Sequence, residues 1–595
     1  MKELRTILPY FKPYMGSFYL GLVCVLVANA FQVAGPYLIK LAIDDFDDPA
    51  VTAGRIASYA GLLVLVALLG GVARYGMREL LNGMSRRIES DLRDDFFRHL
   101  LSLDATFYGQ TRTGDLMSRA TNDTLAVRMA TGPAIMYTVN TAASFVFGLA
   151  LMLWISPRLT AYALVPMMVL PPFVIGFGRI IHRRFEEIQE QFSSLSTFVQ
   201  ENLTGVRIVR AYTQEDEQAR QFDVFNQEYR ARNMNLVITA GALNPVLMLF
   251  AGAALVVVTW LGALEVIAGR ITVGDYVAFG LYLVLLIWPM IALGWVVNLY
   301  QRGAASMSRI NKIMNAERTV LVPAEPRSIA DAKGEIEFDD VSFVYPDTER
   351  AVLHRISFSV RPGETVAIVG PTGSGKSTLM VLLARIYDPT EGEIRLDGVP
   401  LTEVDPAAVR AKIGMVPQDT FLFSDTLANN IGLGGGPNRV DTESSDASSH
   451  IADAARIAQF HDEIESFPDG YETLLGERGI NLSGGQKQRA TLARAIARDP
   501  LVLVLDDALS AVDTHTEAKI LSDLRAVMAG RTSFVISHRV SAVMHADKIL
   551  VLDEGALVET GTHRDLIAAG GTYARLLRRQ LLEEDLRAAA VTTPA

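Results

Sequence analysis

Apolar residues gather in six long runs in the first half of the chain, and polar residues separate these runs. A helix that crosses a bilayer needs about 20 mostly apolar residues. The runs that meet this length cover residues 18–39, 56–75, 135–155, 159–177, 236–264 and 276–299. The pattern predicts an all-α membrane domain of six helices over residues 18–315, preceded by a short segment, 1–17.

The connections between these runs differ in charge. Arginine is frequent in the long connections after the second and fourth runs, whereas the short connection after the first run is acidic, with Asp44, Asp45, Asp47 and Asp48. Basic residues favour the cytoplasmic side of a membrane. We therefore expect an integral membrane protein with the long connections and both chain termini in the cytoplasm.

The long connections keep a helical repeat of apolar residues. Ile88, Leu92, Phe96 and Leu100 follow one another at a spacing of four, which predicts a helix that extends the second run beyond the membrane. Glycine and polar residues interrupt the pattern at 113–116, and polar residues interrupt it again at 212–215. These tips are either docking points for the second half of the chain or solvated turns.

A few polar side chains lie inside the apolar runs. They are Asn29, Gln32, Asn140, Asn244 and Asn298. An unpaired polar group is costly in hydrocarbon, so such residues face a neighbouring helix or a cavity. Hydrogen bonds between helices are the favoured role, ahead of contact with a ligand.

Composition narrows the possible partners. The chain has 595 residues, enough for several domains, and half of them are hydrophobic. Its net charge of −11 argues against nucleic acid, whose phosphates need a basic surface. The single cysteine, Cys24, excludes a disulfide within the chain.

The second half of the chain predicts a soluble α/β domain. A polar connector at 316–335, with Pro323 and Pro326, separates it from the membrane half. The α/β domain is expected over 336–580, followed by a tail, 581–595. Its first strand, 336–345, alternates apolar and polar residues and ends in Tyr345, whose ring is suited either to stacking on adenine or to packing.

A glycine-rich turn lies between a strand at 364–369 and a helix at 379–386. It reads Gly370, Pro371, Thr372, Gly373, Ser374, Gly375, Lys376, Ser377 and Thr378, which fits G-x-x-x-x-G-K-[ST]. Backbone N–H groups of such a turn form an anion cradle. Lys376 adds a positive charge for the β- and γ-phosphates, and Ser377 can hold Mg²⁺. The turn predicts a nucleoside triphosphate site.

Two further stretches suit the same ligand. The apolar strand at 501–505 leads into Asp506 and Asp507, an arrangement that sets a carboxylate on Mg²⁺ beside the phosphates. The stretch Leu482, Ser483, Gly484, Gly485 and Gln486 opens a helix at 487–497. The start of that helix presents N–H groups and a serine hydroxyl to an anion.

These motifs together resemble the ATPase of ABC transporters, in which Leu-Ser-Gly-Gly-Gln is the signature. The shared order is Tyr345, 370–378, Gln418, 482–486, Asp506 and His538. With six apolar runs ahead of one ATPase, residues from about 8 to 580 are similar to one half of an ABC exporter. The resemblance implies an ABC-type P-loop domain with a helical subdomain that uses ATP and Mg²⁺.

The resemblance also implies roles for individual residues. Tyr345 would stack on adenine, Gln418 would lie near Mg²⁺ and the attacking water, and His538 would sense the γ-phosphate. The residues implied to bind ATP are Tyr345, 370–378, Gln418, Ser483, Gly484, Gly485, Gln486, Asp506 and His538, and those implied to hold Mg²⁺ are Ser377, Gln418 and Asp506. Residues 510–513 are similar to the D-loop, and 476–479 to the segment that meets the membrane domain.

One position departs from the family pattern. The family places a glutamate after the aspartate of the second acidic strand, where it polarises the attacking water, and this chain has Asp507. The aspartate stem is one methylene shorter, and a misplacement of about 1 Å can cost about 10²-fold in rate. We therefore expect nucleotide binding with slow hydrolysis, and a heterodimer with a second half-transporter that carries the glutamate. A homodimer in which Asp507 is an ordinary base is the alternative.

The function implied is ATP-driven export of hydrophobic or amphipathic molecules, such as drugs or lipids, by alternating access. The apolar runs hold no carboxylate or histidine cluster for ion coupling, so the energy is expected to come from the nucleotide. The rival is an ATP-gated channel or a regulatory ATP-binding membrane protein, which stays open because Asp507 weakens hydrolysis. Fusion of the two halves argues against an importer.

Overall fold

The computed structural model describes residues 2–47, 51–346, 348–435, 445–537, 539 and 543–592. It divides into two compact units. Unit 1 comprises Met1–Leu101 and Thr113–Ala316, and unit 2 comprises Ser102–Arg112 and Glu317–Ala595. A short internal segment of the first half of the chain thus belongs to the unit formed by the second half.

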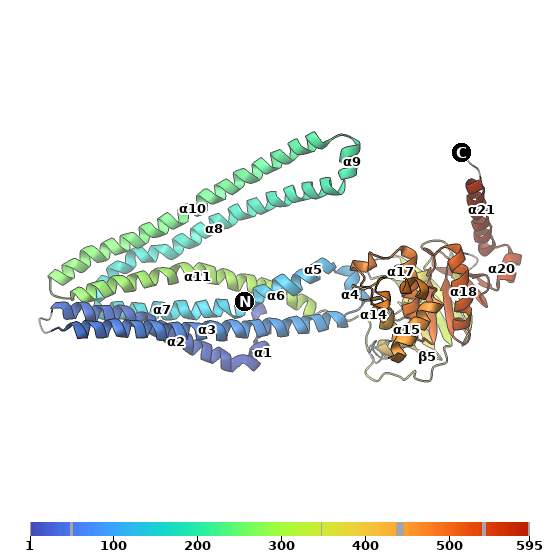
Figure 1. Ribbon diagram of the computed structural model, residues 1–595, viewed down its shortest axis with the longest axis horizontal. Coiled ribbons are helices and arrows are strands. Elements are labelled where there is room, and N and C mark those ends of the chain that lie inside the picture. The colour runs from blue at the N-terminus through green and yellow to red at the C-terminus, as the bar shows by residue number, and fades with distance from the viewer. Residues whose placement is uncertain are drawn as a thin grey trace. The chain divides into compact units, whose positions relative to one another are not determined.

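The described residues of unit 1 form helices and their connections and contain no strand, and Figure 1 shows long helices lying side by side. Its helices are α1 (Leu8–Phe11), α2 (Met15–Asp44), α3 (Ala53–Ser102), α5 (Thr113–Ser118), α6 (Thr124–Thr131), α7 (Pro133–Ile155), α8 (Pro157–Thr204), α9 (Val206–Ala211), α10 (Glu215–Ile267) and α11 (Val273–Met314). Helices α8 and α10 form a long pair that is joined through α9 (Figure 1).

All six apolar runs lie in long helices. Five of them lie in helices that are long and apolar enough to cross a membrane. The remaining run, 159–177, lies within α8, which continues unbroken to Thr204. The prediction of an all-α membrane domain is therefore confirmed, and the prediction of helical extensions agrees with the length of these helices, whereas the sixth span stays a prediction.

Packing in unit 1 follows the predicted faces. Ile88, Leu92 and Phe96 are almost completely buried, which confirms that their spacing of four marks the inner face of α3. The amide nitrogen of Asn29 on α2 donates to the amide oxygen of Asn140 on α7 over 3.0 Å. For these two residues, the predicted hydrogen bonding between helices is confirmed.

The predicted tip at 113–116 is displaced along the chain. Those residues begin α5, whereas the segment that joins unit 2 is Ser102–Arg112, which contains the six-residue helix α4 (Ala105–Gln110). Helix α4 begins after Asp104, whose carboxylate accepts from the Thr106 N–H at 3.2 Å. The second predicted tip, 212–215, joins α9 to α10.

Unit 2 contains two β-sheets. An antiparallel sheet has the order β2-β1-β4-β5, and a six-stranded sheet has the order β10-β9-β3-β8-β7-β6. The strands are β1 (Ile336–Val344), β2 (Ala351–Val360), β3 (Thr365–Val369), β4 (Glu391–Leu396), β5 (Val399–Pro400), β6 (Ile413–Val416), β7 (Val502–Asp506), β8 (Thr532–Ile536), β9 (Lys548–Asp553) and β10 (Ala556–Gly561). Strands β3, β7 and β8 run parallel, so their carboxyl ends meet at one edge of the larger sheet.

Helices complete unit 2. They are α4, α12 (Lys376–Leu383), α13 (Pro406–Ala411), α14 (Leu427–Gly432), α15 (Ser445–Ile457), α16 (His461–Glu465), α17 (Gly484–Ala497), α18 (Thr514–Met528), α20 (His563–Ala569) and α21 (Thr572–Thr592). Helices α14 to α17 share an apolar core with β7 and α18, separate from the core between the two sheets. The expectation of an α/β P-loop domain with a helical subdomain is confirmed.

Candidate nucleotide-binding site

The glycine-rich turn connects β3 to the first residue of α12 at the carboxyl edge of the large sheet. Gly375 has φ +94°, a conformation that residues with a Cβ rarely adopt, and a Cβ there would lie 2.6 Å from Leu353 Cδ2. A Cβ on Gly370 would lie 2.1 Å from the Leu552 carbonyl oxygen. Both glycines are therefore required for the turn to close around a ligand.

A cavity of about 280 Å³ opens above this turn. It is lined by Val352, Gly370, Thr372, Gly373, Gly375, Lys376, Ser377, Thr378, Gln418, Asp506, Asp507, Ile536 and Ser537. The structure thus brings together residues that are far apart in the sequence, and they come from the ends of β3, β7 and β8 and from the segment after β6.

Two side-chain groups in the turn can bind phosphate oxygens. The Lys376 ammonium donates to the carbonyl oxygens of Gly370 at 2.9 Å and Pro371 at 2.7 Å, so its charge is held within the turn. The hydroxyl of Ser374 is buried and has no hydrogen-bond partner among the described residues. Phosphate oxygens would satisfy this buried hydroxyl, whose desolvation otherwise costs about 1–3 kcal/mol.

Burial changes the acid–base properties of the site. Burial lowers the pKa of Lys376 below its usual value, although Asp506 and Asp507 oppose that effect. Burial likewise raises the pKa of the Asp506 carboxyl, a hydrogen bond with Ser377 lowers it, and the Asp507 charge raises it. A triphosphate with a divalent cation would reverse both shifts, because it offers charges of the opposite sign to each group.

The donor set fits Mg²⁺ that arrives with a nucleotide. Among the described residues there is no group of three or more His, Cys, Asp or Glu that would hold a metal alone. Ser377, Gln418 and Asp506 line one cavity and offer oxygen ligands. Mg²⁺ is typically bound by one or two carboxylates together with substrate phosphates and waters, and these three residues meet that description.

Asp507 follows β7 directly and lines the cavity. Its backbone has φ +48°, a left-handed conformation that aspartate tolerates better than most residues. Its N–H donates to the Ile536 carbonyl oxygen on β8 at 2.9 Å, which fixes the backbone at the sheet edge. The backbone position of this short acidic residue is therefore set by the sheet.

The remaining predicted residues lie in different places. Tyr345 is half-buried, its hydroxyl lies 3.2 Å from the Thr378 hydroxyl, and its ring meets those of Phe343 and Tyr387 edge to face. It therefore borders the turn through Thr378. His538 lies outside the described residues.

The signature stretch starts α17 and does not belong to the described lining of the cavity. Ser483 and Gln486 form a reciprocal cap, in which the Gln486 N–H donates to the Ser483 hydroxyl and the Ser483 N–H donates to the Gln486 side chain. A Cβ on Gly485 would lie 2.9 Å from the Ala511 carbonyl oxygen, so the helix start packs closely on residues 510–513.

Sequence reasoning missed Gln488, which links the signature helix to residues 510–513. Its buried amide donates to the Ser510 hydroxyl and accepts from the Ala511 N–H, both at 2.8 Å. A glutamine inside a helix gives no sequence signal of this kind, since the partner is known only once the chain has folded.

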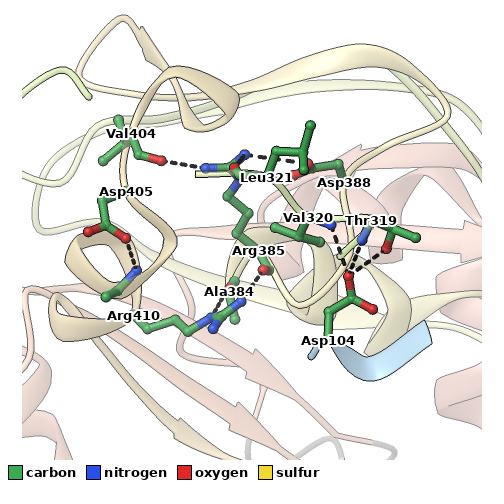
Figure 2. A network of polar contacts seen from close by, with 11 residues as sticks. Asp104, Thr319, Val320, Leu321, Ala384, Arg385, Asp388, Val404, Asp405 and Arg410 are labelled. Carbon is green, nitrogen blue, oxygen red and sulfur yellow. Dashed lines mark hydrogen bonds and ion pairs between the residues drawn. The ribbon is translucent and has the colours of Figure 1, made fainter. Parts of the chain in front are cut away.

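A second polar network lies at the far end of α12 and also escaped prediction (Figure 2). Asp104 accepts hydrogen bonds from the backbone N–H groups of Thr319 and Val320 and from the Thr319 hydroxyl. Buried Arg385, just beyond α12, donates to the Leu321 carbonyl oxygen at 3.0 Å and pairs with Asp388. We call Thr319–Leu321 the strap, because Asp104 holds one end and Arg385 holds the other.

The strap network is electrostatically favourable. Burial raises the pKa of the Asp104 carboxyl, but the hydrogen bonds from Val320 and Thr319 outweigh burial, and the pKa ends below its usual value. Asp104 is therefore negatively charged near neutral pH, and its hydrogen bonds to the strap are charge-assisted.

The fold and the cavity define a membrane protein with a P-loop nucleotide-binding unit, and comparison with known proteins supplies the family. Residues 18–290 match the family "ABC transporter transmembrane region", and residues 353–510 match the family "ABC transporter". The chain belongs to the ABC transporter family and is an ABC exporter with an ATPase domain.

The similarity to known proteins extends over almost the whole chain. The chain is 39% identical to the probable multidrug resistance ABC transporter ATP-binding/permease protein YheI of Bacillus subtilis, covering 96% of this chain and 97% of that protein. It is 38% identical to the multidrug resistance-like ATP-binding protein MdlA of Escherichia coli, covering 96% and 95%. A solved bacterial Atm1-family ABC exporter with ATP bound is 29% identical, with a TM-score of 0.78, covering 95% of this chain and 99% of that one.

Proposed function

We propose that this protein exports hydrophobic or amphipathic molecules, drugs or lipids, as one half of a dimeric ABC exporter. The observation that carries the proposal is the cavity lined by Lys376, Ser377 and Asp506, in a chain whose described residues also include five helices long and apolar enough to cross a membrane. Binding of two ATP molecules between two such units would close them, and hydrolysis would reset them.

The residue roles follow from chemistry at the site. Residues 370–378 and Tyr345 bind ATP, and Ser483, Gly484, Gly485 and Gln486 contact the ATP held by the partner subunit. Mg²⁺, when bound, neutralises phosphate charge beside Ser377, Gln418 and Asp506. Asp507 orients the attacking water, with Gln418 and His538 near the γ-phosphate.

In the proposed heterodimer, the nucleotide site that contains Asp507 hydrolyses ATP more slowly than the site of the partner. The Asp507 backbone is fixed by β8, so the side chain cannot advance to recover the length that a glutamate would provide. A displaced carboxylate lowers the rate of hydrolysis while leaving the phosphate contacts intact. An intact signature remains able to complete the site of a partner.

Coupling between ATP and the membrane helices runs through the strap. Helix α12 carries Lys376 at its start and leads to Arg385 just past its end. The strap follows α11 in the chain, and Asp104 follows α3, so a shift of α12 acts on both connections at once. The coupling element of the first long connection is therefore Ser102–Arg112.

The test is ATP-dependent uptake of a labelled substrate into inverted membrane vesicles against a gradient, with this chain alone and with candidate partners that carry glutamate at the matching position. Uptake that requires both chains supports the heterodimer. Brisk ATPase from the isolated chain that Asp507→Ala abolishes would refute the slow-site assignment. Uptake that only runs down a gradient would identify a channel and refute export.

A further inference from the structure

Unit 1 contains a cavity of about 420 Å³ between α2, α3, α7 and α11. Its polar lining includes Gln32 of α2, Arg74 and Arg78 of α3, and Asn140 of α7. Val284, Leu285 and Trp288 of α11 contribute an apolar part. No aspartate or glutamate is among the described residues that line it.

The two arginines form an unbalanced pair of positive charges. Residues 74 and 78 are four apart on one helix, so their side chains share a face and repel each other. Arg74 donates to the Gln32 side-chain oxygen at 3.4 Å, which is a long and weak hydrogen bond. In the part of the chain that the structure describes, neither arginine pairs with a carboxylate.

The position of Arg74 within α3 also points to a bound ligand. It is the second-last residue of the apolar run 56–75, and charged side chains in membrane spans usually face a ligand pathway or a partner. A bound anion would remove the repulsion between the two arginines and supply the missing partner.

Asn140 adds a third donor. The carbonyl of Val25 can only accept, so the Asn29 nitrogen that lies 2.8 Å from it is the donor, and the same nitrogen donates to the Asn140 oxygen. The Ser144 hydroxyl donates to the Asn29 oxygen, which is consistent with this orientation. The NH₂ group of Asn140 is therefore available at the cavity.

We propose that this cavity binds the anionic head group of an amphipathic molecule, with a phosphate ester on an apolar chain as the class that fits best. Arg74 and Arg78 would bind the phosphate oxygens, since guanidinium groups match phosphate geometry. The apolar chain would lie against α11 at Val284 and Trp288. This deepens the export function proposed above and rests on it only for the claim that the ligand is cargo.

The test measures binding at the cavity itself. The full chain, with Trp154, Trp260 and Trp295 replaced by Phe, retains Trp288 as its one tryptophan, because the sequence has four. In phosphatidylcholine nanodiscs, decyl phosphate should change Trp288 fluorescence saturably, whereas decyltrimethylammonium and decyl maltoside should not. Arg74→Gln and Arg78→Gln should each weaken decyl phosphate binding by about tenfold.

Matched variants keep the result interpretable. Arg86→Gln removes an exposed charge further along α3 and should leave binding unchanged. Arg74→Lys keeps the charge but lacks the guanidinium geometry, so it should bind more tightly than Arg74→Gln and more weakly than wild type, an order that a folding defect would not produce. Unchanged binding in the Arg74→Gln/Arg78→Gln double variant, or equal binding of the cationic amphiphile, would overturn the proposal.

Two further measurements identify the source of the ligand and separate the two proposals. Adding phosphatidylglycerol to the nanodisc should compete with decyl phosphate if the bilayer supplies the anion, and absence of competition would point to a free amphiphile; both results support the phosphate chemistry. Binding without ATP-driven transport would retain the anion site and refute export. Transport with no anion binding would retain the export function and refute the anion site.

Discussion

The two units of this protein reveal their chemistry in opposite ways. In unit 2 the ligand groups are carried by short motifs in which neighbouring residues act together, and Lys376 reaches the carbonyls of its own turn. In unit 1 the polar groups that matter are single residues on different helices, such as Asn29 and Asn140, and they meet only through packing. Local chemistry can be read along a chain, whereas chemistry assembled across helices cannot.

The largest expected effect is loss of nucleotide binding in unit 2. Lys376→Ala removes the ammonium from the phosphate cradle and should lower ATPase activity by about 10²-fold or more. Lys519→Ala, an exposed lysine on α18 of the same unit, is the control and should behave like wild type. Affinity for a fluorescent ATP analogue and the rate of phosphate release measure the effect, and a small loss would remove Lys376 from the site.

The next effect is a gain. Asp507→Glu restores the longer acid and should raise the turnover of this chain's own site by about 10²-fold, with ATP affinity unchanged. Asp340→Glu makes the same replacement at another aspartate with positive φ, +50°, and should have no effect. Single-turnover hydrolysis by the assembled dimer, with the partner's acid removed, reports this site alone, and an unchanged rate contradicts the slow-site proposal.

A smaller effect should distinguish transport through unit 1 from ATP binding in unit 2. Asp104→Ala removes the hydrogen bonds to the strap and should lower transport several-fold while ATP binding stays intact, because the phosphate site is untouched. Asp405→Ala is a closely matched control, since Asp405 also caps a six-residue helix, α13, but accepts from Ala407 (Figure 2). Equal losses of transport in both variants would show that the Asp104 contacts with the strap contribute no more than ordinary helix capping.

The smallest effect concerns pH. The pKa of Asp506 is raised, so this acid takes up a proton at a higher pH than usual as the solution is acidified, and Mg²⁺ must displace that proton. The pKa of Lys376 is lowered, so nucleotide affinity should decline on the alkaline side earlier than for an ordinary lysine. Affinity for a non-hydrolysable ATP analogue, with and without Mg²⁺, should show both limbs, and Asp506→Asn should abolish the Mg²⁺-dependent acidic limb.

The extent of sequence prediction follows the same division. The six apolar runs, the strands before Gly370 and Asp506, and the inner face of α3 were all predictable from periodicity and composition. Helix α4 was not predicted, because its start depends on a single capping carboxylate at Asp104. Gln488, Arg385 and the paired arginines of the unit 1 cavity were not identified, since each acts on residues that are brought close only by folding.

The segment Ser102–Arg112 has a consequence for biosynthesis. It leaves the ribosome more than two hundred residues before Thr319, its partner through Asp104, and |i−j| for that hydrogen bond is 215. A recombinant fragment that begins at Glu317 would therefore lack Ser102–Arg112, which is one segment of unit 2. During synthesis, Asp104 is therefore made well before Thr319 and Val320, the residues that it binds just past the middle of the chain.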